Sequence, residues 1–132
     1  MKKISLLLIA FSISALLMAQ VTKSDQAVQQ TVIKLFDALS NRDSVSLKAH
    51  STSDITLHEY GKVWNIDTLI LKAITGNQSA DFKRTNSFEF INTTVNKNMA
   101  LVNYRLQSAR TKDGKQATVQ WLETEVLVKE KK

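Results

Sequence analysis

Two glutamates at strand positions that alternation predicts to be buried are the residues best suited to chemistry. Glu59 shares a strand face with Leu57, and Glu123 shares a strand face with Trp121. The other apolar members of these two faces are Ile55, Val119 and Leu127. An apolar setting raises the pKa of a carboxyl group, which can then give or take a proton near neutral pH. The sequence therefore predicts Glu59 and Glu123 as candidate catalytic residues.

Each of these glutamates also has a plainer interpretation. One or both carboxylates would then form ion pairs, for which Arg105, Lys62 and Lys83 are the available partners. A carboxylate at an exposed strand end would need no partner. These alternatives stay open from the sequence.

Aromatic side chains are the candidates for lining a binding pocket. We select Tyr60, Trp64 and Trp121 as ligand-binding residues. Trp64 follows Gly61 in a segment expected to be a loop before a helix, a place where functional residues are common. The alternative is that these aromatics fill the core.

Several kinds of site are not expected. The sequence contains no cysteine, so a cysteine nucleophile, a thiolate metal site and a disulfide are all excluded. It contains two histidines, and His58 neighbours Glu59 in a predicted strand, where adjacent side chains point to opposite faces. No phosphate loop, nucleophile elbow or zinc-protease motif is present. We therefore expect no metal and no cofactor.

The N-terminus has the order of a cleavable signal peptide. Lys2 and Lys3 precede an apolar run over residues 4–18, and Ala19 and Gln20 follow. A membrane anchor is the alternative, but about 15 apolar residues fall short of the roughly 20 that span a bilayer. We expect a signal peptide over residues 1–19, one domain over residues 20–132, and a periplasmic or secreted mature protein.

The net charge does not favour nucleic acid as a partner. Without Lys2 and Lys3 the count of Lys and Arg falls from 18 to 16 against 12 Asp and Glu, so the formal net charge falls from +6 to +4. The remaining basic residues are scattered rather than gathered on one face with aromatics, as nucleic-acid binding requires.

Helical periodicity is found in the first half of the mature chain. Apolar residues at helical spacing predict an amphipathic helix over residues 22–40, with Thr22 and Asp25 as a capping arrangement. A short helix follows from Asp43 or Ser44. After it, alternation predicts a strand over residues 55–60, and Asp67 is the expected N-cap of a third helix that ends before Gly76.

The second half predicts three antiparallel strands over residues 81–94, 99–111 and 116–129. Residues 96–98 and 112–115 join them, and the Asp-Gly pair in the second turn is a strong hairpin signal. Helices followed by such a meander indicate an α+β domain. Both faces of the last strand are partly apolar, so one face would cover the helices and the other a partner subunit.

The order of these elements resembles the nuclear transport factor 2-like superfamily, including its SnoaL-like and ketosteroid isomerase-like members. The local residues agree over residues 36–57 and again over residues 119–124. The matching positions of the first segment are Phe36, Ala38, Leu39, Asn41, Asp43, Leu47 and the run Ser53-Asp54-Ile55-Thr56-Leu57. The resemblance implies a curled antiparallel sheet wrapped around N-terminal helices, a cone-shaped pocket and a homodimer formed through the outer sheet face.

The resemblance also implies roles for the two glutamates. Glu59 falls where bacterial ketosteroid isomerases have their general base, and Glu123 falls approximately where a protonated acid stabilises the enolate oxygen. The helix tyrosine that also stabilises this oxygen falls at Leu35, which cannot donate a hydrogen bond. Relatives usually continue with a further strand after a segment like residues 126–132, so the final strand is either missing, supplied by a partner or outside this sequence.

Three functions are compatible with these observations. The leading expectation is an exported domain that binds a small, largely apolar molecule. The second is an enzyme of lyase or isomerase type with Glu59 as general base and Glu123 as acid or oxyanion partner. The third is a non-catalytic interaction module that uses the outer sheet face or an open sheet edge.

Overall fold

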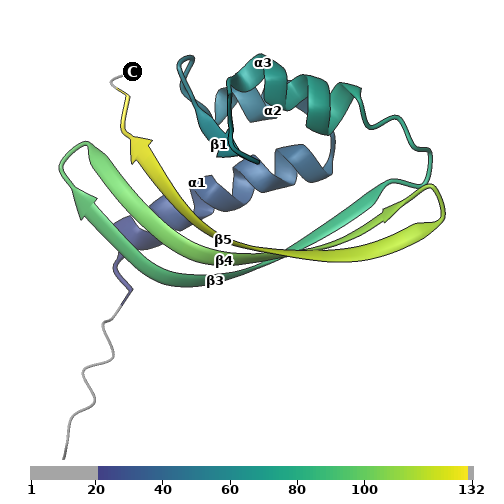
Figure 1. Ribbon diagram of the computed structural model, residues 1–132. Coiled ribbons are helices and arrows are strands. Elements are labelled where there is room, and N and C mark those ends of the chain that lie inside the picture. The colour runs from purple at the N-terminus through teal and green to yellow at the C-terminus, as the bar shows by residue number, and fades with distance from the viewer. Residues whose placement is uncertain (1–20, 131–132) are drawn as a thin grey trace, which may run out of the picture.

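The computed structural model describes residues 21–130, and the predicted signal peptide lies outside the described residues. The described chain forms helices on one side of a curled three-stranded sheet (Figure 1). Among these residues, no helix combines the length and the apolar character needed to cross a membrane.

Helix α1, Lys23–Ser40, is the long amphipathic helix that the sequence predicts. Thr22 is its N-cap, and the side chains of Thr22 and Asp25 form the reciprocal capping box, which satisfies two backbone N–H groups at the helix start. The buried face of the helix consists of Val32, Leu35, Phe36, Ala38 and Leu39. The predicted helix and its cap are both confirmed.

Helix α2, Ser44–Ala49, is the predicted short helix, and Asp43 is its N-cap. The Asp43 carboxylate accepts hydrogen bonds from the backbone of Val45 and Ser46, both at 3.0 Å. The hydrogen bond from the Ser46 hydroxyl is the main cause that lowers the pKa of Asp43. The helix places Leu47 in the core, where it is fully buried.

The next segment is a hairpin, which differs from the prediction. Strand β1, Leu57–Glu59, pairs with strand β2, Lys62–Trp64, and Tyr60 and Gly61 form the turn with φ values of 49° and 71°. The predicted strand over residues 55–60 is therefore shorter, and the expectation that Trp64 lies in a loop is wrong. Three residues are too few to show the alternation by which a strand is recognised in a sequence.

The third helix is also built differently at its start. Helix α3, Ile66–Leu69, has Asn65 rather than Asp67 as its N-cap, because the Asn65 side chain accepts from the Thr68 N–H at 2.9 Å. Its continuation, Ile70–Thr75, is a π-helical segment, labelled η1. Gly76 caps the segment as predicted, although its φ of −73° lies in the right-handed region.

The sheet is a meander of three strands of equal length, in the order β3-β4-β5. These strands are β3, Lys83–Asn96, β4, Met99–Lys112, and β5, Lys115–Val128. Lys97-Asn98 and Asp113-Gly114 form the two turns, so all three predicted strands are present, with shifted ends. Ile91 has no partner on β4, which marks a bulge in β3 between Phe90 and Asn92.

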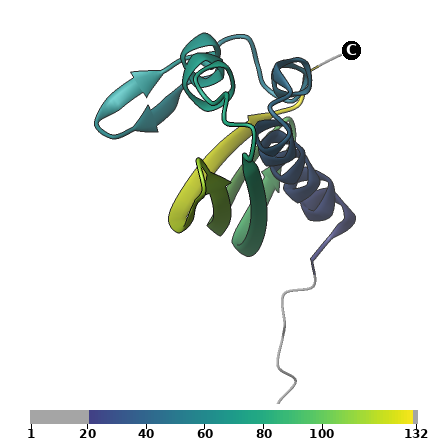
Figure 2. The same cartoon turned by 90° about the vertical axis from the view of Figure 1, so that its right-hand side faces the viewer.

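The sheet has an inner face toward the helices and an outer face away from them. Figures 1 and 2 show the strands curving around α1, with α2, α3 and the β1–β2 hairpin on the same side of the sheet. The inner side chains of β4 are buried: Ala100, Val102, Tyr104, Leu106 and Ser108. The predicted α+β architecture, a curled sheet wrapped around N-terminal helices, is confirmed, and β5 forms one edge of this sheet.

Candidate functional site

The inner face of β5 carries a row of side chains that are only partly covered. We call these residues the β5 row: Val119, Trp121, Glu123, Glu125 and Leu127. All of them are half-buried, whereas their neighbours on the inner face of β4 are buried. The row combines apolar surface with two carboxyl groups, which is the composition expected of a binding surface rather than of a closed core.

Tyr104 connects the two carboxyl groups of this row. Its hydroxyl lies 2.6 Å from Glu123 Oε2 and 2.6 Å from Glu125 Oε1. Tyr104 is completely buried, and it is the cross-strand partner of Glu123, so the register of β4 and β5 sets this contact. Phe36, Phe88 and Phe90 surround its ring with centroids 5.8 to 6.2 Å away.

The Glu123–Tyr104–Glu125 arrangement would lack one proton if both carboxyl groups were ionised. A phenol has a single proton, so it donates to one carboxylate, and the second close contact requires a proton on the other carboxyl group. Burial raises the pKa of both Glu123 and Glu125. The same burial, together with the two carboxylates, raises the pKa of Tyr104. The arrangement can therefore hold, donate or accept a proton at a half-buried position.

Glu59 lies on the same side of the sheet as Glu123. It is half-buried at the end of β1, and its charge contributes to raising the pKa of Glu123. In residues 21–130 neither predicted glutamate forms an ion pair, and of the three predicted partners Arg105 pairs with Glu89 instead. The charge of Glu59 acts on Glu123, and the catalytic role of both residues stays a prediction.

The two aromatics of the hairpin have different surroundings. Tyr60 lies at the tip of the β1–β2 turn and is 82% exposed. Figure 2 shows this hairpin extending beyond the sheet. Trp64 is half-buried against the core, and the ammonium group of Lys72 lies 5.4 Å from the centre of its ring. Of the three predicted ligand-binding aromatics, Trp121 alone belongs to the β5 row.

Two arginines that the sequence analysis did not select lie against Trp121. The guanidinium carbon of Arg84 is 5.8 Å from the centre of the indole ring, and that of Arg110 is 5.6 Å away. Arg84 also lies over the ring of Phe36 at 5.4 Å. Their convergence depends on strand register and on side-chain direction, and neither is visible in the sequence.

A buried polar network holds Arg84 in place. Arg84 Nε donates to Asn86 Oδ1 at 2.9 Å and to Ser108 Oγ at 3.2 Å. Asn86 Nδ2 in turn donates to the Ser40 hydroxyl at 2.8 Å, which ties the network to the end of α1. Ser108 is completely buried, so these hydrogen bonds are formed away from water.

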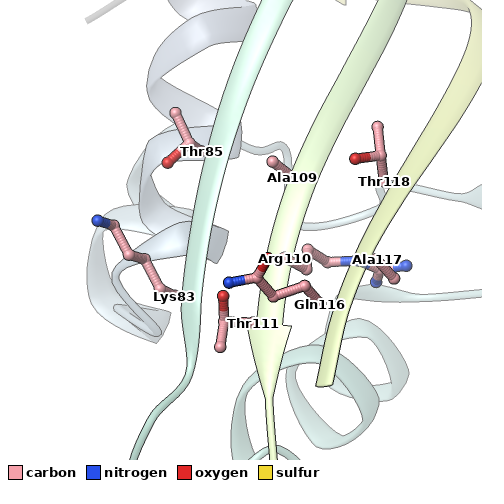
Figure 3. Close-up of a pocket in the computed structure, with 8 residues that line it drawn as sticks. All are labelled: Lys83, Thr85, Ala109, Arg110, Thr111, Gln116, Ala117 and Thr118. Atoms are coloured by element: carbon pink, nitrogen blue, oxygen red, sulfur yellow. The ribbon is translucent and has the colours of Figure 1, made fainter. Parts of the chain in front are cut away.

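The described residues also carry surface hollows, and Arg110 is among the residues that line the larger of two. The larger, about 350 Å³, opens at the end of the sheet near the Asp113-Gly114 turn and is lined largely by polar side chains such as Thr85, Thr111 and Thr118 (Figure 3). The smaller, about 140 Å³, lies between the start of α1 and the β3 bulge. Glu59, Trp64, Trp121 and Glu123 line neither hollow. Within residues 21–130 no group of three or more metal-ligating side chains is gathered.

The fold has counterparts among solved structures. A conserved protein from Planctomyces limnophilus is 14% identical, with a TM-score of 0.66, over 78% of this chain and 81% of that chain. A protein from Shewanella frigidimarina, described as a candidate ketosteroid isomerase, is 17% identical, with a TM-score of 0.63, over 80% of this chain and 86% of that chain. An NTF-2-like protein of unknown function from Silicibacter pomeroyi is 14% identical, with a TM-score of 0.51, over 77% of this chain and 99% of that chain. No protein-family model matches the sequence, and no curated protein matches it.

Proposed function

We propose that this chain, which has the nuclear transport factor 2-like fold, binds a small, largely apolar molecule on the inner face of its sheet. The binding surface would be the β5 row, with Trp121 as the main apolar contact. Glu123 would supply a polar group that orients the ligand. Small-molecule sites commonly combine an apolar lining with a few polar groups in this way.

One observation carries this proposal: the β5 row is half-buried although it lies on the face that packs against the helices. Apolar side chains on a helix-covered face are ordinarily buried, because burial contributes roughly 25 cal/mol per Å² of apolar surface. A ligand lying on Trp121 and Leu127 would remove the remaining apolar surface from water. Binding would therefore be favoured by the burial of apolar surface that folding leaves accessible to water.

A second candidate function is general acid–base catalysis by Glu59 and Glu123. The observation that favours it is the charge interaction between the two groups, because a carboxyl group with a raised pKa beside a second carboxylate suits proton transfer. In this case a ligand found by screening would be converted to a product, and Glu59→Gln would abolish the conversion. Recovery of the ligand unchanged would contradict this function.

The proposed binding is tested by thermal unfolding of the mature chain in the presence of a broad set of hydrophobic metabolites. A ligand at 100 times its Kd stabilises the folded state by about 2.7 kcal/mol, which gives a clear rise in Tm. Trp121→Ala should remove this rise. Leu122→Ala is the matched control, because Leu122 is the next residue of β5 and is exposed on the outer face. A rise that survives Trp121→Ala unchanged would place the ligand elsewhere and overturn the proposal.

A further inference from the structure

Arg84 on β3 and Arg110 on β4 are direct cross-strand partners on the inner face. We call them the arginine pair. Like charges that face each other across two strands destabilise a sheet. Both guanidinium groups nevertheless approach the same indole ring, that of Trp121, to within 6 Å. An arrangement that works against stability needs a further cause.

The surroundings of Arg84 fix its orientation and leave part of it unused. Its Nε atom donates to Asn86 and Ser108, while its guanidinium carbon lies within 6 Å of the ring centres of Phe36 and Trp121. Its two terminal nitrogens form no hydrogen bond to any other described residue. A guanidinium group held by Nε keeps these terminal N–H groups available in the fork that matches a carboxylate or a phosphate.

The charge of Arg84 is not balanced by an ion pair. Burial, followed by the charge of Arg110, lowers the pKa of Arg84 to about 10. The group therefore stays charged at neutral pH. Glu123 is the acid whose charge acts on Arg84, but the Tyr104 hydroxyl already contacts its carboxyl group. No ion pair within residues 21–130 involves Arg84 or Arg110. A half-buried charge without a partner is costly to keep.

Stacking on the aromatic rings does not account for the second arginine. A cation over an aromatic ring contributes about 0.5 to 2 kcal/mol, and one arginine would suffice for that contact. The Arg110 guanidinium forms no hydrogen bond to any other described side chain. Two positive groups near one ring, each with free donors, can together bind an anion.

We propose that the arginine pair binds the acidic group, a carboxylate or a phosphate, of a ligand whose apolar part lies on Trp121 and the rest of the β5 row. This inference rests on the proposed function and names its ligand class: an amphipathic organic acid. The anion would offset the repulsion between Arg84 and Arg110. The apolar part would cover the half-buried surface along β5.

The inference is tested with three probes that share one alkyl chain: octanoate, octyl phosphate and the neutral octanamide. The protein carries Trp64→Phe, so that Trp121 is its one tryptophan and reports binding by its fluorescence. Octanoate or octyl phosphate should bind at least about tenfold more tightly than octanamide, the range expected of hydrogen bonds to charged groups. The order of the two acids shows which anion the pair prefers.

Arg110→Gln is the variant of choice, because Arg110 is outside the hydrogen-bond network that holds Arg84. It should weaken binding of the preferred acid about tenfold and leave octanamide unchanged. Arg105→Gln, with the same charge change on the outer face, should have no effect. Equal binding of acid and amide, or an acid unaffected by Arg110→Gln, would overturn the inference while ligand binding itself stands. A failure of the proposed function would instead show as no stabilisation by any screened metabolite.

Discussion

Strands β4 and β5 present the same inner face to the helices, yet their side chains have different roles. Along β4 this face carries Val102, Leu106 and the ring of Tyr104, all completely or almost completely buried. Along β5 it carries Trp121, Glu123 and other half-buried residues. The inner side chains of β3, the other edge strand, are also half-buried, although α1 packs mainly on β3.

The position of a strand within the sheet, central or edge, therefore decides whether its inward-facing side chains are buried or half-buried. β4 is the central strand, with a neighbouring strand on each side, and its buried inner side chains stabilise the fold. β5 is an edge strand with incomplete cover, so carboxyl groups are tolerated there beside apolar residues. The candidate site lies at the boundary between the two.

The largest expected effect comes from shortening one side chain on each strand. Leu106→Ala should lower the free energy of unfolding by about 2 to 5 kcal/mol, because Leu106 is 1% exposed and its removal leaves a cavity. Leu127→Ala should cost about 1 kcal/mol or less, since solvent already reaches that side chain. Urea unfolding of both variants measures the difference, and equal losses would show that β4 and β5 are covered alike.

A smaller effect is expected from removing a carboxyl group of the β5 row. Burial raises the pKa of Glu125 above its ordinary value of 4.5 in the folded protein. The folded state therefore binds more protons than the unfolded state above about pH 4.5, and stability falls as pH rises through the raised pKa. Glu125→Gln removes this loss, so the variant should gain stability relative to the wild type as pH rises from about 4.5 through the raised pKa of Glu125.

The comparison of the two proteins at each pH isolates Glu125 from other titrating groups. Hydrogen bonds lower the pKa of Asp43 and Asp81, with Ser46 and Ser79 as the main donors, so their stabilisation is lost as pH falls. That loss affects wild type and variant alike. A difference in Tm between Glu125→Gln and wild type that stays constant over this pH range would show that Glu125 is not protonated on folding.

The smallest effect on stability is expected on the opposite face of β5. Val126 is 62% exposed and lies beside Leu101 on β4, within a group of exposed apolar residues that also includes Met99 and Val128. Val126→Lys should change the free energy of unfolding by less than about 1 kcal/mol. If the predicted homodimer forms through this face, the variant should nevertheless sediment as a monomer.

Thr118→Lys is the control for this measurement, because Thr118 lies on the same face of β5 outside the apolar group. It should leave the sedimentation unchanged. A wild-type protein that sediments as a monomer at tens of micromolar would show that the dimer prediction is wrong.

Most of the fold could be predicted from the sequence because its longest elements have clear periods. The apolar stripe of α1 and the alternation of the three long strands extend over many residues, so single exceptions do not hide them. The predictions are wrong for the short elements. β2 has three residues and no measurable period, and at the start of α3 Asn65 and Asp67 are both residue types that cap helices.

The candidate site was predictable only in part. Alternation placed Glu123 on the inner face, and the same rule would have found Glu125 two residues later. The sequence does not predict Arg84 and Arg110 as site residues, because their proximity depends on the register of β3 and β4 and on the direction of long side chains. The hydrogen bonds of Tyr104 to both glutamates likewise follow from packing.

The capping box at the start of α1 and its buried face have a consequence for how the chain acquires its structure during translation. Local signals define where α1 begins, but the surfaces that cover Val32 and Phe36 belong to β3 and β4, which are synthesised much later. Until both strands have been added, α1 can pack only on the short helix α2 and the elements that follow it. Stable burial of its apolar face therefore requires the second half of the chain.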